Sequence, residues 1–104
     1  SIARMAIDNC FADSWGQEGL GNRDRSLVML GTLIGLQQPK ELKNHIKIAI
    51  LNGLTVREIE AVLVQASPYV GAPAISSALT AAVEALREAG LSPDTLTAEE
   101  KGLL

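Results

Sequence analysis

The feature that most constrains the fold is a helical period of apolar residues that recurs along the chain. Leucine, isoleucine, valine and alanine return roughly every three or four residues, and no segment of useful length alternates strictly between apolar and polar residues as a half-buried strand would. Glycine or proline interrupts the pattern between segments, as is typical of short connections between helices. We therefore expect an all-α fold, a compact bundle of about five to six helices.

The breaks in the pattern set the expected helix boundaries. Thr55 and Glu58 match a capping box, in which the hydroxyl and the carboxylate each accept a hydrogen bond from a backbone amide at the start of a helix. That helix should stop before Pro68, because proline has no amide hydrogen to donate. The tail after Gly90 could add a helical turn or form an arm on a neighbouring subunit. The expected helices cover about residues 3–14, 24–36, 39–52, 55–66 and 74–89.

Length and composition exclude several classes of protein. A chain of 104 residues is long enough for one domain, so we expect residues 1–104 to form a single domain with a tail at 91–104. One cysteine and one histidine exclude a disulfide framework and a multi-cysteine zinc site. No glycine-rich phosphate loop is present. The net charge of −3 argues against a nucleic-acid partner. We expect no metal site.

The sequence predicts no membrane partner. The longest apolar run, 27–36, is about half the length of about twenty residues that a spanning helix needs. The first ten residues lack the basic and apolar regions of a signal peptide. The cytoplasm is therefore the expected compartment. Because the chain begins with Ser1 and not with methionine, we also expect that an N-terminal piece precedes it.

The helix expected at 39–52 has apolar residues on more than one side. Leu42 and Ile46 share one face, whereas Ile48 and Leu51 point elsewhere. A second buried face in so short a chain predicts a homo-oligomer. The alternative is that Ile48 and Leu51 are isolated apolar residues on a monomer's surface, which are common.

The same helix carries the residues best suited to acid–base chemistry. Glu41 and His45 are four residues apart and stack on one side of a helix, so the carboxylate could orient the imidazole for proton transfer. The alternative is a half-buried pair with no reaction. One glutamate and one histidine are too few ligands for a metal. Lys40, Lys43 and Lys47 are expected to form a solvated basic face.

Four further residues admit both a functional and a structural interpretation. Arg25, at the start of the helix expected at 24–36, could bind an anion or pair with a carboxylate such as Asp24. Tyr69 is expected in a proline-flanked loop, where it could serve function or anchor the loop. Trp15 could line a pocket or fill a junction. Cys10 is expected to pack as a small apolar residue.

Four short motifs occur in order: R-S/T-L-x-x-L, E-L-x-x-H, N-G-L-T-x-x-E-I and Q-x-x-x-Y-x-G-x-P. This ordered set resembles the carboxymuconolactone decarboxylase family, and the resemblance covers about residues 9–89. It implies an alkylhydroperoxidase-like fold and a homo-oligomer, a trimer or hexamer. The peroxidase branch of that superfamily uses Cys-x-x-Cys-x-x-x-His, whose cysteines would fall on Gln38 and Glu41. Disulfide-based peroxide reduction is therefore not expected, unless Cys10 pairs between subunits.

The family reaction removes CO2 from 4-carboxymuconolactone without a cofactor, because the unsaturated lactone itself accepts the electron pair of the departing carboxylate. The resemblance implies that His45 is the acid, Glu41 orients it and Arg25 contacts an anion. The substrate-binding residues implied are Trp15, Tyr69 and Ser26. Three alternatives stay open: a related small anionic lactone or keto acid as substrate, a catalytically silent oligomeric scaffold, and, less favoured, a thiol activity of Cys10.

Overall fold

The structure is a computed structural model that describes Ile2 and residues 18–91. Within 18–91 it contains helices and no strand. The all-α class is therefore confirmed. The expected helix at 3–14, with Cys10, and the tail from residue 92 lie outside the described residues, so the total number of helices stays a prediction. The described helices are α3 (Asn22–Gly35), α4 (Pro39–Leu51), α5 (Val56–Val70) and α6 (Ala72–Glu88).

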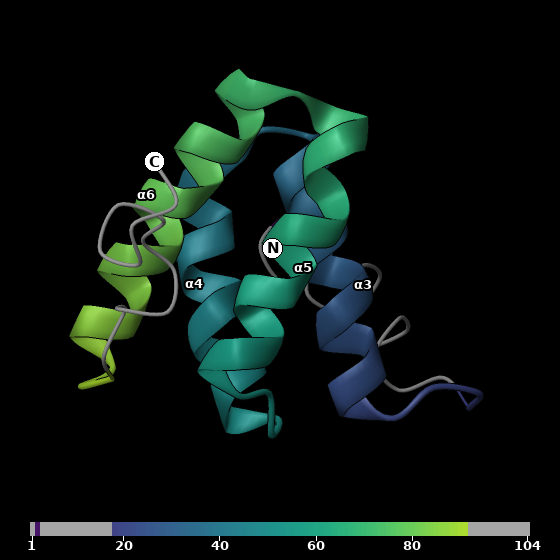
Figure 1. The fold of residues 1–104 in the computed structure, drawn as a ribbon. Coiled ribbons are helices and arrows are strands. Elements are labelled where there is room, and N and C mark those ends of the chain that lie inside the picture. Colours follow the sequence, from purple (N-terminus) through teal and green to yellow (C-terminus); the bar gives the residue numbers. More distant parts are fainter. Residues whose placement is uncertain (1, 3–17, 92–104) are drawn as a thin grey trace.

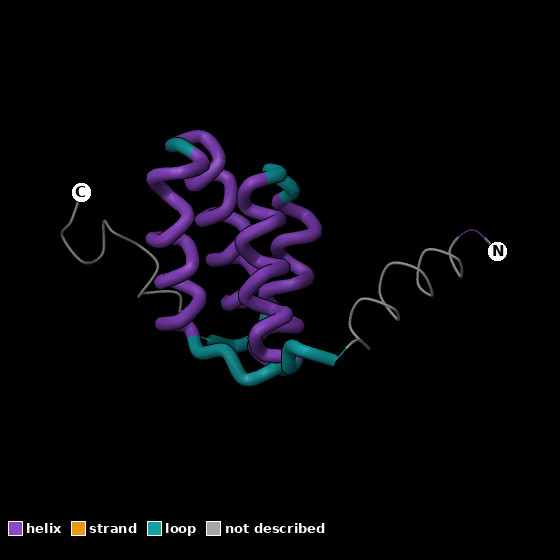
Figure 2. Tube along the Cα trace, turned by 90° about the vertical axis from the view of Figure 1, so that its right-hand side faces the viewer, coloured by secondary structure: helices purple, strands orange, loops and turns teal. Residues whose placement is uncertain are grey.

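The four described helices lie side by side as a bundle (Figure 1). The first turn of α3 contacts the end of α4, because Asn52 Nδ2 donates a hydrogen bond to Ser26 Oγ over 3.0 Å. The C-terminal ends of α3 and α5 also lie close together. A Cβ added to Gly35 would lie 3.9 Å from Val70 Cγ1. Thus α3 and α5 run parallel, with α4 antiparallel to α3. Figure 2 shows the short connections at the two ends of this bundle.

The core forms from the faces that the helical period predicts. Leu42 and Ile46 of α4 are each 1% exposed and pack with leucine and isoleucine side chains of α3 and α5. The buried face of α6 is built mostly from alanine, which lets its backbone come close to its neighbours. Its buried residues are Ala74, Ala78, Ala81, Ala82, Ala85 and Leu86.

The end of α5 differs from the sequence-based expectation. The helix continues through Pro68 to Val70, so the predicted stop at residue 66 is wrong, and Tyr69 lies on a helical turn and not in a loop. Proline at position 68 leaves the Val64 carbonyl without its usual amide donor. The Ser67 hydroxyl donates to that carbonyl over 2.9 Å and replaces the missing bond.

The other helix boundaries follow the expected signals. Both hydrogen bonds of the capping box at the start of α5 are present, with Glu58 N to Thr55 Oγ1 at 3.1 Å and Thr55 N to Glu58 Oε1 at 3.0 Å. Pro39 occupies the first turn of α4, where its missing amide hydrogen costs nothing. After α5 the chain turns at Gly71, whose φ of 85° is a conformation that favours glycine. None of the described helices is long and apolar enough to cross a membrane.

Candidate active site

Helix α4 places His45 in the interior of the bundle. The side chain is only 8% exposed, between the buried residues Leu42, Ile46 and Ala49 of the same helix. No hydrogen bond joins the imidazole to another residue of the described part of the chain. A buried imidazole without a partner is costly, because each polar nitrogen loses its hydrogen bonds to water. Such a group is suited to binding or protonating a molecule that enters from outside.

Glu41 lies one turn before His45 on α4, but its side chain is exposed. No ion pair or hydrogen bond between Glu41 and His45 occurs among the described residues. The structure therefore places the two residues on one helix, as the motif predicts, without bringing the carboxylate onto the imidazole.

Arg25 belongs to α3 and lies near the C-terminal end of α4, whereas Glu41 is in the first turn of α4. It is half-buried in the first turn of α3, and its Nε donates to the Leu20 carbonyl over 2.9 Å. The neighbouring Ser26 is hydrogen-bonded to Asn52 at the end of α4. Asn52 follows Glu41 by eleven residues, a rise of about 16 Å along the helix. His45 lies between these ends, about 10 Å along α4 from Asn52. Among the described residues, no hydrogen bond or ion pair joins any two of Arg25, Glu41 and His45.

Ser26 forms a hydrogen bond with Asn52 that the sequence signalled only weakly. Ser26 is 2% exposed, and its hydroxyl accepts the hydrogen bond from Asn52. This bond ties the start of α3 to the end of α4. The only signal in the sequence is that Asn52 lies on the same stripe of α4 as His45, two turns further on.

Tyr69 lines a groove to which His45 does not contribute. Its side chain is 81% exposed on the last turn of α5 and lines an open groove of about 550 Å³ between α3 and α5. Neither His45, Glu41 nor Arg25 lines this groove. Trp15 lies outside the described residues. The groove is lined by Leu27, Gly31, Glu58, Ala61, Val62, Gln65, Ala66 and Tyr69.

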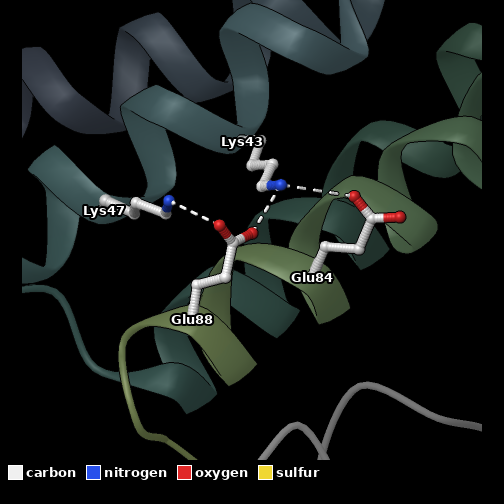
Figure 3. Close-up of polar contacts among 4 residues, drawn as sticks. All are labelled: Lys43, Lys47, Glu84 and Glu88. Carbon is white, nitrogen blue, oxygen red and sulfur yellow. Dashed lines mark hydrogen bonds and ion pairs between the residues drawn. The ribbon is translucent and has the colours of Figure 1, made fainter.

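Two of the lysines on the expected basic face remain partly exposed and also form ion pairs. Lys43 contacts Glu84 and Glu88 of α6, and Lys47 Nζ lies 3.2 Å from Glu88 Oε1 (Figure 3). The hydrogen bond from Lys43, followed by that from Lys47, lowers the pKa of Glu88. The hydrogen bond with Glu88 is the main cause that raises the pKa of Lys43. These exposed pairs link α4, the helix that carries His45, to α6 at the surface.

Comparison with known proteins identifies the family. The sequence model of the carboxymuconolactone decarboxylase family matches residues 2–85. The chain belongs to the carboxymuconolactone decarboxylase family. The resemblance found in the four ordered motifs is thereby confirmed.

Two relatives of the chain are named decarboxylases. The chain is 31% identical over 93 residues to a 4-carboxymuconolactone decarboxylase of Acinetobacter baylyi, an alignment covering 89% of the chain and 66% of that protein. It is 38% identical over 65 residues to the nitrosuccinic acid decarboxylase npaB of Metarhizium robertsii, which covers 62% of the chain and 46% of that protein. The chain thus spans about two thirds of the length of the first relative and less than half of the second. No solved structure matches the chain.

Proposed function

We propose that the chain is a carboxy-lyase that decarboxylates a small carboxylated substrate, either 4-carboxymuconolactone or a related lactone or keto acid. Membership of the family supports this, as do two relatives that are both named decarboxylases. The observation that carries the proposal is His45. The chain's only imidazole is buried, lacks a partner among residues 18–91 and occupies the histidine of the E-L-x-x-H motif.

The proposed reaction needs an acid and an apolar environment. When the bond between the ring carbon and the carboxylate breaks, its electron pair moves into the unsaturated lactone and develops negative charge on the carbonyl oxygen. A proton added to carbon then gives the enol-lactone. The apolar side chains beside His45 on α4 would disfavour the charged carboxylate and so favour loss of CO2. In this scheme His45 delivers the proton.

The supporting residues keep the roles that the family resemblance implies. Glu41, one turn away, would orient the imidazole after its exposed side chain turns inward. Arg25 would contact the substrate carboxylate or the developing oxyanion, reaching it from the start of α3. Trp15, Tyr69 and Ser26 remain the proposed substrate-binding residues. No cofactor takes part in this scheme.

We further propose that the protein acts as a homo-oligomer in the cytoplasm, as a trimer or hexamer. The two apolar side chains that the sequence placed off the buried face of α4 support this, because Leu51 is 85% exposed and Ile48 is 39% exposed in the single chain. Covering them would remove apolar surface from water. Sedimentation of the purified protein measures the assembly directly.

The experiment that tests the function is a substrate comparison. Purified protein is mixed separately with 4-carboxymuconolactone and with nitrosuccinate, the second chosen because one relative is named for that substrate. Consumption is followed by ultraviolet absorbance and by release of CO2. The proposal expects catalysed release from the lactone. Release of CO2 from nitrosuccinate alone would reassign the substrate. Release of CO2 from neither compound, together with no shift in the protein's melting temperature by a panel of lactones and keto acids, would favour a catalytically silent scaffold.

A further inference from the structure

The buried hydroxyl of Ser26 has a proton that no described residue accepts. Ser26 is 2% exposed, and its oxygen accepts the hydrogen bond from Asn52 Nδ2 at 3.0 Å. A serine hydroxyl also has one proton to donate. Within residues 18–91 the Ser26 side chain forms no other hydrogen bond. Buried donors in native structures nearly always have an acceptor, so an unused one indicates a ligand or a catalytic role.

Other hydroxyls on the described helices satisfy their donors locally. Thr32 and Thr80 each donate to the backbone carbonyl four residues earlier, over 2.8 Å and 3.2 Å. Serine in a helix has the same option. Ser26 does not use it, although it is far more buried than either threonine. Because the Asn52 amide occupies one side of the Ser26 oxygen, the proton points away from that amide.

His45 is the second buried polar group without a described partner, and α4 relates it to the first. His45 and Asn52 are seven residues apart on α4, which is two turns along one face, or about 10 Å. Ala49, the residue between them on this stripe, is fully buried. Two polar groups with unmet hydrogen bonds thus lie at the two ends of a short apolar stripe. This pattern suits a small molecule with a polar group at each end.

Both compounds named for the relatives are dicarboxylic acids. 4-Carboxymuconolactone carries a carboxymethyl group beside the carboxyl group that it loses, and nitrosuccinate is a succinate with a nitro substituent. Decarboxylation removes one carboxylate and leaves the other, which takes no part in the bond changes. A hydrogen bond of about 2.8 Å at each end leaves about 4 Å of the spacing between the two buried groups. That remainder is comparable to the short carbon chain between a retained carboxylate and the reacting carbons.

We propose that Ser26 donates its hydroxyl proton to the carboxylate that the substrate retains, and that Asn52 is the positioning residue that aims this proton. A hydrogen bond to a charged group is stronger than one between neutral groups, so one well-aimed hydroxyl contributes usefully to binding. The retained carboxylate is bound alike before and during the reaction, so loss of this contact should raise KM and leave kcat little changed. This inference rests on the proposed decarboxylase function and narrows its substrates to small dicarboxylates.

An analogue without the second carboxylate tests the substrate class on the wild-type protein. The analogue of 4-carboxymuconolactone has a methyl group in place of the carboxymethyl group. We expect its KM to be higher by about tenfold or more, with a similar kcat. Ser26→Ala should raise the KM for the dicarboxylate by a similar factor and leave the KM for the analogue unchanged. If the wild type acts on nitrosuccinate instead, 2-nitropropanoate serves as the analogue.

Asn52→Asp separates the direction of the hydrogen bond from its contribution to stability. Aspartate has nearly the size of asparagine, but its ionised side chain only accepts, so the Ser26 proton turns toward it and the link between α3 and α4 remains. We expect the melting temperature to change little, while the KM for the dicarboxylate rises by about tenfold or more and that for the analogue does not. Asn44→Asp makes the same change at an exposed position of α4 and should keep both wild-type KM values.

Three results would overturn the inference and leave the decarboxylase function standing. They are equal wild-type KM values for the dicarboxylate and its analogue, wild-type KM values in both Ser26→Ala and Asn52→Asp, and a rise in KM of the same size for both compounds in these variants. The last result would give the bond between Ser26 and Asn52 a structural role alone. Absence of decarboxylation of either dicarboxylate by the wild type would overturn the proposed function itself, and this inference with it.

Discussion

Removing the cap of α5 by Thr55→Ala should destabilise the fold by a predictable amount. The Thr55 hydroxyl accepts the hydrogen bond of the Glu58 amide at 3.1 Å, and that amide is one of the donors that the helix itself leaves unused. Loss of a threonine cap typically costs about 1 kcal/mol, within a range of about 0.5–2. For a domain of this size, about 1 kcal/mol corresponds to a fall in Tm of about 4–8 °C.

Thermal and urea unfolding followed by circular dichroism measure this effect, and the chain offers a matched control. Thr80→Ala makes the same chemical change within α6, where the hydroxyl only bonds back to the Ser76 carbonyl at 3.2 Å. Because alanine is the better helix former, that variant should be neutral or gain a few tenths of a kcal/mol. Thr55→Ser keeps the cap and should lose little. Equal losses in the Thr55→Ala and Thr80→Ala variants would refute the capping argument.

Three further perturbations follow from the described contacts. Ile46→Ala truncates a residue that is 1% exposed, and urea unfolding should show that the free energy of unfolding falls by about 2–5 kcal/mol. A smaller fall than that of an exposed valine-to-alanine change would contradict the core position of Ile46. Ser26→Ala leaves the Asn52 amide without its described partner and should cost about 1–3 kcal/mol, and Ser26→Thr should lose less if it retains the bond. The hydrogen bonds from Lys43 and Lys47 lower the pKa of Glu88. The stability that this carboxylate contributes is therefore present above its ordinary pKa and is lost as pH falls through the lowered pKa. Glu88→Gln should reduce Tm at neutral pH and have no effect on Tm in strong acid. A loss that is the same at both pH values would show that the ion pairs with Lys43 and Lys47 are not its cause.

The helical fold could be predicted because its signals are local. Apolar spacing, the Thr55 cap and the proline at the start of α4 each act within a few residues, and each described helix lies where they indicate. The end of α5 was mispredicted for a reason that is equally local. A serine one residue before Pro68 supplies the missing hydrogen bond, and a rule that treats proline alone as a helix breaker omits that compensation.

The candidate site could be predicted only in part, because its geometry depends on how the helices pack. The motif spacing correctly put Glu41 and His45 one turn apart on a single helix, but it did not reveal that one faces solvent and the other the core. The separation of Arg25 from Glu41 follows from the antiparallel pairing of α3 and α4, which no single motif encodes. The Ser26–Asn52 hydrogen bond joins residues 26 positions apart, and only the fold brings them together.

The central claim is that the buried imidazole of His45 serves a decarboxylation. The most direct measurement is the rate of 4-carboxymuconolactone loss, followed by ultraviolet absorbance, for wild type, His45→Gln and Asn44→Ala. Asn44 is an exposed neighbour on α4 and controls for disturbance of the helix. Removing a general acid should lower kcat by about 10²–10⁴-fold in a folded His45→Gln protein, with Asn44→Ala close to wild type. Full activity in a folded His45→Gln variant would contradict the account.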